Sequence, residues 1–248
     1  MSKRRVAVLA DVHGNAVALA AVLAELEREQ PDAIVHCGDL TWGPLPEATA
    51  ELLAGLDVLY VSGNADRFVT ELDAKLADPT TEPTDRERWL AEHHDDRLRA
   101  WLASFAPTVQ LEIDGLGDVL FSHGSPRSDE ELITVETSEA RLAEAIAGIA
   151  ADVVVTAHTH VRYTRRALGC TFLNPGSVGM PYEGEPGAYW ALLGPGIEHR
   201  RTQYDLDETE RRYRESGDPR ADEMVEILRR PPAPAEVIAH AESLAFSG

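Results

Sequence analysis

The stretch RRVAVLADVHGNAVALAAVLAELEREQPDAIVHCGD, residues 4–39, opens the chain with a strand, a helix and a second strand. The run RRVAVLA at residues 4–10 predicts the first strand. Apolar residues at helical spacing predict a helix over residues 16–29, which ends before Pro31. The run at residues 32–38 predicts the second strand. This alternation is typical of a parallel α/β sheet, whose active crevice lies beyond the carboxyl ends of the strands.

The rest of the chain continues the α/β pattern and then adds hairpins. A charged, helical stretch at about 66–106 follows a third predicted strand at residues 56–63. Further strands are predicted at 108–114, 117–124, 153–155, 161–168, 171–173, 188–193 and 197–202, with a helix between them at 138–149. We therefore expect one domain over residues 1–248, with a helical insertion at about 66–106 and a helical C-terminal segment at about 206–248.

Composition excludes several classes of protein. A formal net charge of −20 argues against binding to nucleic acid polymers or to an anionic membrane, because both require a basic face. We find no apolar run long enough to cross a bilayer, and an aspartate interrupts the first apolar run too early for a signal peptide, so we expect a cytoplasmic protein. Cys37 and Cys170 lie in apolar strands, which predicts packed thiols and no disulfide.

A polar residue that can bind metal follows each strand that could line a common crevice. These residues are Asp11 and His13, Asp39, Asn64, His123, and the pair His158 and His160, and Asp66 stands two residues after Asn64. Each has an ordinary explanation when taken alone, as a helix cap, a turn residue or a loop histidine. Their joint occurrence at successive strand ends favours a metal site.

The donor set has a definite chemical character. Carboxylates, imidazoles and an amide oxygen, with no thiolate, suit Mn²⁺, Fe²⁺ or Zn²⁺ in a catalytic role. Seven side chains are too many for one tetrahedral ion, whereas two ions that share a carboxylate would use them and leave positions for water and substrate. In two-metal hydrolytic sites the ions clamp the attacking and leaving oxygens, and a water between them is the natural nucleophile.

The ordered series D-x-H, GD, GN-x-D, GH and AH-x-H resembles the calcineurin-like metallophosphoesterase superfamily, and NPGSVGMP at residues 174–181 is similar to its small bacterial phosphodiesterase-type branch. The resemblance implies an α/β fold, a four-layer α/β/β/α sandwich of two mixed sheets flanked by helices. It also implies two divalent ions, with Mn²⁺ expected first and Fe, Zn, Ni or Co as alternatives. The residues that it implies as ligands are Asp11, His13 and His160 for one ion, Asn64, His123 and His158 for the other, and Asp39 as the bridge.

One position departs from the superfamily pattern. Many members have a histidine after the Asn of GN-x-D, placed to protonate the leaving group, whereas this chain has Ala65. Asp66 matches the acidic position that would orient such a histidine. The catalytic candidates are therefore Asp39, Asn64 and Asp66, and the source of a leaving-group proton stays open, with His93 and His94 of the predicted insertion as possible donors.

Four residues are predicted to bind substrate. Arg67 and Arg127 offer guanidinium groups that suit a phosphate, although a surface ion pair is the alternative for each. Asn174 and Ser177 can present hydrogen-bond donors, although NPGS is also an ordinary turn. His93 and His94 lie in a charged region and are expected to be solvated.

Two functions from different classes remain. The first is a phosphoesterase that attacks a small phosphomonoester, phosphodiester or nucleotide phosphoanhydride with a hydroxide that bridges the metals. The second is a non-catalytic metal-binding scaffold or regulatory protein on the same fold, but a scaffold is expected to have lost ligands and this chain retains all seven. The expected partner is a small phosphorylated molecule, with a nucleotide-like compound as one candidate.

Overall fold

The computed structural model describes residues 2–80 and 82–244. Its strands are β1 (Val6–Leu9), β2 (Ala33–Cys37), β3 (Val58–Val61), β4 (Val109–Ile113), β5 (Gly117–Phe121), β6 (Val153–Val155), β7 (Tyr163–Ala167), β8 (Cys170–Asn174), β9 (Ala188–Leu193) and β10 (Ile197–Thr202). Its helices are α1 (Ala16–Glu29), α2 (Pro46–Leu53), α3 (Asn64–Ala77), α4 (Asp85–Glu92), α5 (Asp96–Leu102), α6 (Glu139–Ala145), α7 (Leu206–Ser216), α8 (Ala221–Arg229) and α9 (Pro234–Ser243). No helix in these two ranges is both long and apolar enough to cross a lipid bilayer.

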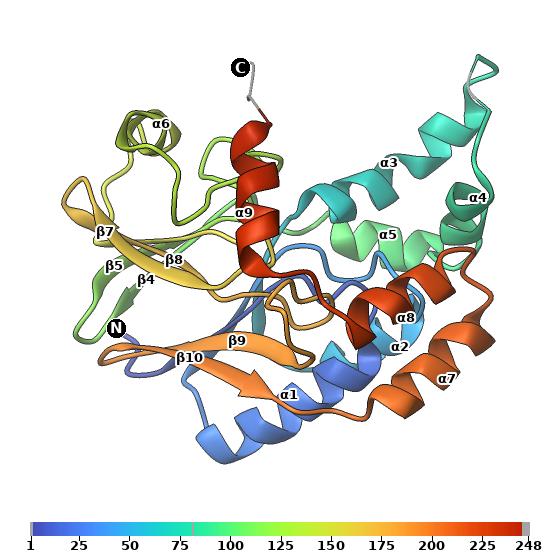
Figure 1. The fold of residues 1–248 in the computed structure, drawn as a ribbon, viewed down its shortest axis with the longest axis horizontal. Helices are drawn as coiled ribbons and strands as arrows, with labels where there is room; N and C mark the ends of the chain where they lie inside the picture. Colours follow the sequence, from blue (N-terminus) through green and yellow to red (C-terminus); the bar gives the residue numbers. More distant parts are fainter. Residues whose placement is uncertain (1, 81, 245–248) are drawn as a thin grey trace.

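The strands form two mixed five-stranded sheets in the part of the chain that the structure describes (Figure 1). The first sheet has the order β10-β9-β1-β2-β3, in which β1, β2 and β3 are parallel and β9 and β10 are antiparallel to their neighbours. The second has the order β4-β5-β6-β8-β7, and it contains the predicted hairpin of β4 and β5. Parallel β1, β2 and β3 have α1 and α2 as their crossovers, which brings their carboxyl ends to one edge.

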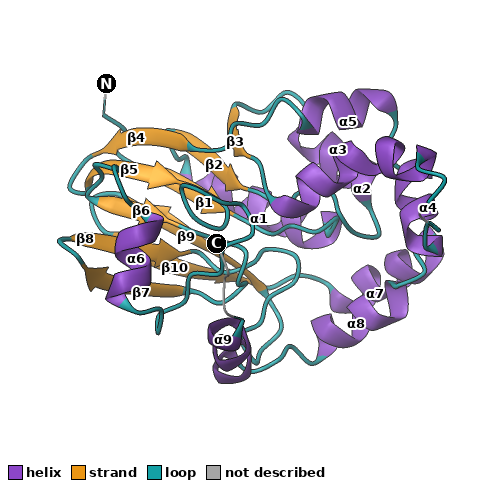
Figure 2. Cartoon of the chain, turned by 90° about the horizontal axis from the view of Figure 1, so that it is seen from above, coloured by secondary structure: helices purple, strands orange, loops and turns teal. Residues whose placement is uncertain are grey.

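The two sheets pack face to face, and helices cover their outer faces. Alternate residues of both sheets, such as Val8, Val35, Val119 and Val155, form a shared apolar core between them. A second core joins the outer face of the first sheet to α1, and a third joins the outer face of the second sheet to α6. The predicted four-layer α/β/β/α sandwich is confirmed. Figure 2 shows the strands gathered on one side of the molecule and α3–α5, α7 and α8 on the other.

Both cysteines are buried and free, as the sequence predicted. Cys37 belongs to the core between the sheets, and Cys170 packs in the core under α6. Burial raises the pKa of both thiols, so neither is a reactive thiolate at neutral pH.

A buried ion pair joins the helical insertion to the C-terminal helices. The guanidinium of Arg86 on α4 donates to the carboxylate of Asp218 at 3.0 Å, and both side chains are buried. The guanidinium carbon also lies 3.9 Å from the centre of the Trp42 ring. Arg86 therefore ties α4 and the α7–α8 connection to the loop that follows β2.

We predict that Asp218→Asn lowers the free energy of unfolding by about 3–5 kcal/mol, because it leaves the buried charge of Arg86 without its carboxylate. Urea denaturation measures the change. The matched control is Asp85→Asn, which breaks the exposed Arg88–Asp85 pair and is expected to cost at most about 1 kcal/mol. Equal effects of the two substitutions would contradict the prediction.

Candidate metal centre

The predicted ligands meet at the shared edge where five strands end. Asp11 and His13 follow β1, and Asp39 follows β2. The remaining ligands stand after later strands: Asn64 at the start of α3 behind β3, His123 behind β5, and His158 and His160 behind β6. Because the two sheets face each other, side chains from both reach one site.

The backbone at these positions is unusual. Seven non-glycine residues within 2–80 and 82–244 have positive φ, and five of them are predicted ligands: Asp11, His13, Asp39, His158 and His160, with φ between 47° and 62°. Left-handed backbone at such residues costs about 1–3 kcal/mol each and persists where the surroundings hold it in place. In this chain the strain is concentrated where the chain turns at strand ends to aim ligand side chains inward.

Two glycines allow the ligand loops to approach closely. A Cβ at Gly63 would lie 2.2 Å from Oδ1 of Asp39, and one at Gly38 would lie 2.5 Å from Nδ1 of His123. Neither contact is sterically possible, so any larger residue would displace a ligand. The G of GD and the G of GN are therefore required by packing against the ligands themselves.

The ligands form two adjacent triads. Asp11, His13 and His160 make one, and Asp39, His123 and His158 make the other, with the ligand atoms of each triad within 4.8 Å of one another. Oδ2 of Asp39 lies 3.7 Å from Nε2 of His13 and 3.5 Å from Nε2 of His123, so a single oxygen stands between the triads. Asn64 joins the second triad, because its Oδ1 lies 3.0 Å from Nε2 of His123.

Backbone carbonyls orient three of the four imidazoles. Nδ1 of His123 lies 2.8 Å from the carbonyl of Cys37, Nδ1 of His160 lies 2.7 Å from that of Met180, and Nδ1 of His13 lies 3.3 Å from that of Trp42. A carbonyl only accepts, so each Nδ1 carries a proton and each Nε2 is the ring atom that faces the other ligands. In metal sites such a hydrogen bond from the second ring nitrogen fixes the tautomer and the orientation of a histidine ligand.

Burial and mutual charge set the protonation of the centre. Burial alone would lower the pKa of His123, but the negative charges of Asp39 and Asp11 outweigh it and raise this pKa to about 10. Burial lowers the pKa of His13 and of His158 to about 4. The pKa of Asp39 is lowered despite burial, chiefly by the charge of His123. The metal-free centre therefore holds one imidazolium next to a carboxylate.

The residues fit divalent ions on two counts. Both carboxylate oxygens of Asp11 are buried and satisfy no geometric hydrogen bond among the described residues, and the contact nearest to a charged partner is that of Oδ1 with Nε2 of the ligand His160 at 3.2 Å. A cation supplies the missing interaction. The donors are also the imidazole, carboxylate and amide groups that borderline and hard divalent ions prefer.

Asp66 has partners that the sequence did not reveal. Its buried carboxylate accepts hydrogen bonds from the backbone N–H groups of Asp39 at 2.8 Å, Leu40 at 2.9 Å and Gly63 at 3.0 Å. Burial and the charge of Asp39 still raise its pKa to about 7. Asp66 thus holds the loops that carry Asp39 and Asn64, and it needs no histidine at position 65 for this role.

The predicted substrate residues separate into two groups. Arg67 lines the cavity beside the triads, whereas Arg127 donates to Glu131 at 2.6 Å and is absent from the cavity lining. Asn174 and Ser177 are fully buried. Asn174 donates to the carbonyl of Ala157, and Ser177 donates to the carbonyl of Asp11 at 2.7 Å. Both side chains therefore support the ligand loops, and their contact with substrate stays a prediction.

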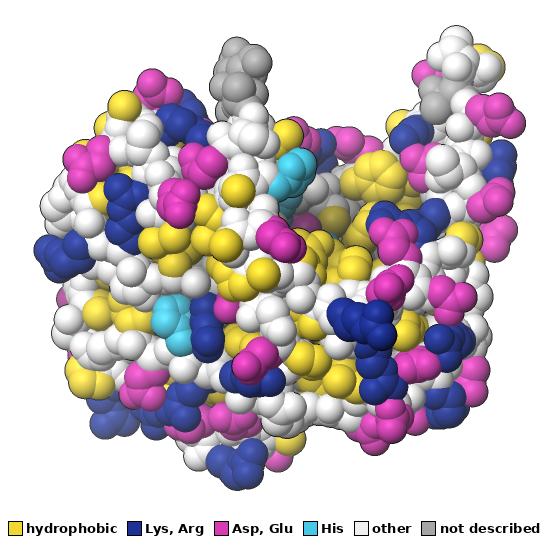
Figure 3. All heavy atoms as spheres, viewed as in Figure 1, with side chains coloured by type: hydrophobic (Ala, Val, Ile, Leu, Met, Phe, Trp, Pro, Cys, Tyr) yellow, Lys and Arg dark blue, Asp and Glu magenta, His cyan; other side chains and the backbone are white. Residues whose placement is uncertain are grey.

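A cavity of about 430 Å³ adjoins the triads, and sequence reasoning missed most of its wall. Besides ligands, Ala65 and Arg67, it is lined by Trp42, Phe68, Glu130, Met180 and Tyr182. The available signal was proximity in sequence, since Trp42 stands three residues after Asp39 and Phe68 four after Asn64. Apolar side chains gather in the hollow between α9 and the arm of α3 and α4 (Figure 3).

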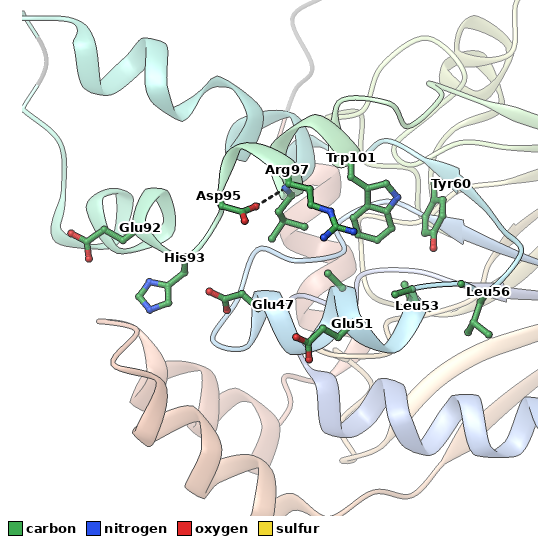
Figure 4. Close-up of a pocket in the computed structure, with 14 residues that line it drawn as sticks. Glu47, Glu51, Leu53, Leu56, Tyr60, Glu92, His93, Asp95, Arg97 and Trp101 are labelled. Atoms are coloured by element: carbon green, nitrogen blue, oxygen red, sulfur yellow. Dashed lines mark hydrogen bonds between the residues drawn. The ribbon is translucent and has the colours of Figure 1, made fainter.

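His93 and His94 do not lie at the metal centre. His93 lines a second cavity of about 590 Å³ between α2 and α4–α5, to which no predicted ligand contributes (Figure 4). The expectation that His94 is solvated is wrong, because its ring is fully buried between the carbonyl of Leu90 and the hydroxyl of Thr41. Neither histidine lines the cavity beside the triads.

Comparison with known proteins agrees with this geometry. The calcineurin-like phosphoesterase superfamily domain matches residues 5–193. An uncharacterized protein of Methanocaldococcus jannaschii is 26% identical over 227 residues, which cover 83% of this chain and 90% of that protein.

Two crystal structures share the architecture. A metallophosphoesterase from Sphaerobacter thermophilus is 27% identical with a TM-score of 0.73, and the match covers 91% of this chain and 98% of that chain. A hypothetical protein from Pyrococcus horikoshii is 21% identical with a TM-score of 0.77, over 94% and 100% of the two chains. The chain belongs to the calcineurin-like phosphoesterase superfamily, which confirms the resemblance found in the sequence.

We predict that protein reconstituted with Mn²⁺ holds close to two ions per chain and that Asp39→Asn weakens both sites. The loss of metal affinity should exceed the ~10- to 100-fold that is typical when a residue hydrogen-bonded to a ligand is replaced. The reason is that one oxygen of Asp39 stands between the two triads. Metal analysis after gel filtration measures the content, and exposed Asp118→Asn is the control. At most one weakly bound ion in the wild-type protein would contradict two sites.

We also predict that Mn²⁺ binding releases about one proton per chain at pH 8, because His123 is protonated in the metal-free protein and must lose its proton to bind. Since the pKa of His123 is about 10, affinity should rise as pH increases from 7 to 9. Titration calorimetry in buffers of different ionisation enthalpy measures the release. An affinity that does not change with pH would refute the assignment.

Proposed function

We propose that this chain is a dinuclear metal-dependent phosphoesterase that hydrolyses a small phosphate ester in the cytoplasm. The observation that carries the proposal is the pair of adjacent triads, with one oxygen of Asp39 between them, at the mouth of a cavity. When bound, two divalent ions neutralise phosphoryl oxygens and activate water for in-line attack. Mn²⁺ is our first expectation, and Fe, Zn, Ni or Co also suit the donors.

The protein's own residues prepare the site for this reaction. Carbonyls aim three imidazoles, and Asp66 fixes the backbone on both sides of the site through its bonds to Asp39 and Gly63. The backbone N–H of Ala65 donates to Oδ1 of Asp39 at 2.8 Å, which leaves Oδ2 directed between the triads. The ligands are therefore preorganised by contacts that do not depend on substrate.

The scaffold alternative is less well supported. A scaffold has no need for strained backbone at five ligand positions or for a fully buried carboxylate, Asp11, that faces an imidazole at 3.2 Å and satisfies no hydrogen bond. Both features cost free energy of folding, and their presence favours a catalytic role over a purely structural one.

The test is a screen of the metal-loaded protein over aryl phosphates, cyclic nucleotides, dinucleoside polyphosphates and mononucleotides. We expect hydrolysis of at least one small ester, its loss on chelation and its recovery with Mn²⁺. Protein that holds two ions and hydrolyses none of these compounds would favour the scaffold.

We predict that the rate falls steeply as the pKa of the leaving group rises. Among the described cavity residues that are not ligands, Tyr182 is the one neutral acid, and burial raises its pKa to about 12, so it is a weak proton donor. General acid catalysis is typically worth ~10²- to 10⁴-fold, and its absence affects alkyl esters most. Rates for a series of substituted phenyl and alkyl phosphates measure the slope.

Ala65→His places an imidazole at the cavity and should help alkyl esters selectively, which flattens that slope. Ala65→Gln is the control, since it adds similar bulk without a titrating group. A shallow slope in the wild-type protein would show that another acid participates.

A further inference from the structure

Two chemically different sets of residues line the cavity beside the metal centre. The first set consists of metal ligands. The second set, which we call the apolar wall, comprises Trp42 from the loop after β2, Ala65 and Phe68 from α3, and Met180 and Tyr182 from the segment between β8 and β9. At about 430 Å³ the cavity has the size of sites that bind small organic molecules.

The aromatic rings of the wall are fixed against the ligands. The Tyr182 ring stacks on the ring of His160 at 4.6 Å, and the Trp42 ring meets that of His13 edge-on at 5.6 Å. Arg86 holds the Trp42 ring from another side, with its guanidinium carbon 3.9 Å from the ring centre. The apolar surface therefore starts next to the first triad, where the group attached to a bound phosphoryl would lie.

The wall carries no uncompensated positive charge. Arg67 is the sole lysine or arginine among the described residues that line the cavity. Its Nε lies 2.8 Å from Asp129, its Nη2 2.6 Å from Glu130 and its Nη1 3.7 Å from Glu71. Glu130 also lines the cavity, so the lining outside the metal ligands is neutral in sum.

These features discriminate between leaving groups. A ring gains free energy by burial against Trp42 and Phe68. A second phosphate or a carboxylate at the same place would lose hydration and meet Glu130 with no free cation to compensate it. Ala65 also lines the cavity, adds to the apolar surface and is itself buried.

We propose that the substrate of this site carries a single phosphoryl group and an uncharged, ring-bearing leaving group that lies against Trp42, Phe68 and Tyr182. The proposal rests on the proposed phosphoesterase function and narrows it. It favours aryl or similar ring esters and disfavours nucleoside polyphosphates and phosphoanhydrides, whose leaving groups are anionic.

The test compares three phosphonates that cannot be hydrolysed, by calorimetric titration of the Mn²⁺-loaded protein. Benzylphosphonate has an uncharged ring, methylphosphonate has none, and 4-carboxybenzylphosphonate has an anionic ring. We expect benzylphosphonate to bind at least ~10-fold more tightly than methylphosphonate, because a ring is buried. The carboxylated compound should bind no more tightly than methylphosphonate.

Variants assign the preference to the wall. Phe68→Ala and Trp42→Ala should each reduce the benzyl-to-methyl affinity ratio several-fold. Because Trp42 also contacts the ligand His13, the Mn²⁺ content of each variant is measured and the two phosphonates are compared at equal metal loading. Trp42→Phe should retain much of the ratio. Trp101→Ala is the matched control, because Trp101 lines the second cavity (Figure 4) and should leave the ratio unaltered.

Charge is tested separately at Glu130, which is largely exposed. Glu130→Gln releases one partner of Arg67, so it should improve binding of 4-carboxybenzylphosphonate several-fold without changing that of benzylphosphonate. Glu144→Gln removes an equally exposed carboxylate near Arg127 and should change neither.

The outcomes separate the two proposals. Equal binding of all three phosphonates, or a preference that survives both Phe68→Ala and Trp42→Ala, overturns the substrate class and leaves the phosphoesterase standing. Failure of every phosphonate to bind and of every ester in the screen to react overturns the proposed function, and the substrate class with it.

Discussion

The buried carboxylate of Asp39 is the group on which the rest of the site depends. Burial of an anion is costly unless positive charge or hydrogen-bond donors replace water. The structure supplies the backbone N–H of Ala65 at 2.8 Å and two imidazoles within 3.7 Å of the other oxygen. The negative charge of Asp39 raises the pKa of His123 well above the usual value for histidine, so this imidazole is protonated at neutral pH. The same balance makes the site ready to exchange that proton for a metal ion.

The backbone around Asp39 is arranged so that ligands from both sheets surround this carboxylate. To surround Asp39, the chain must turn sharply at the ends of strands from both sheets, and it does so with left-handed residues and with glycines that permit contact at Gly38 and Gly63. Such turns cost free energy, and the cores on both sides of each sheet must supply it. The free energy gained by packing the four layers thus offsets the cost of the strained ligand loops.

Local pattern explains what the sequence could predict. Strands, helices and ligands such as Asp11 and His160 are encoded in short segments, because a ligand that directly follows an apolar run lies at a strand end. The apolar wall was not predictable in this way, since Trp42, Phe68 and Tyr182 come from three segments that only the tertiary fold assembles. For the same reason Asn174 and Ser177 looked accessible in sequence but are buried beneath the ligand loops.

The charge of the whole chain differs from the charge around the cavity, because the fold decides which side chains line the cavity. The chain carries a formal charge of −20, yet the cavity wall is neutral in sum and the centre carries carboxylates that call for cations. Bound metals would therefore be the main attraction for an anionic substrate, acting over a short range in a field that repels anions elsewhere. A substrate whose negative charge lies entirely on the phosphoryl group meets this field best, because the ions neutralise that charge and the remainder of the molecule contacts a surface without charge.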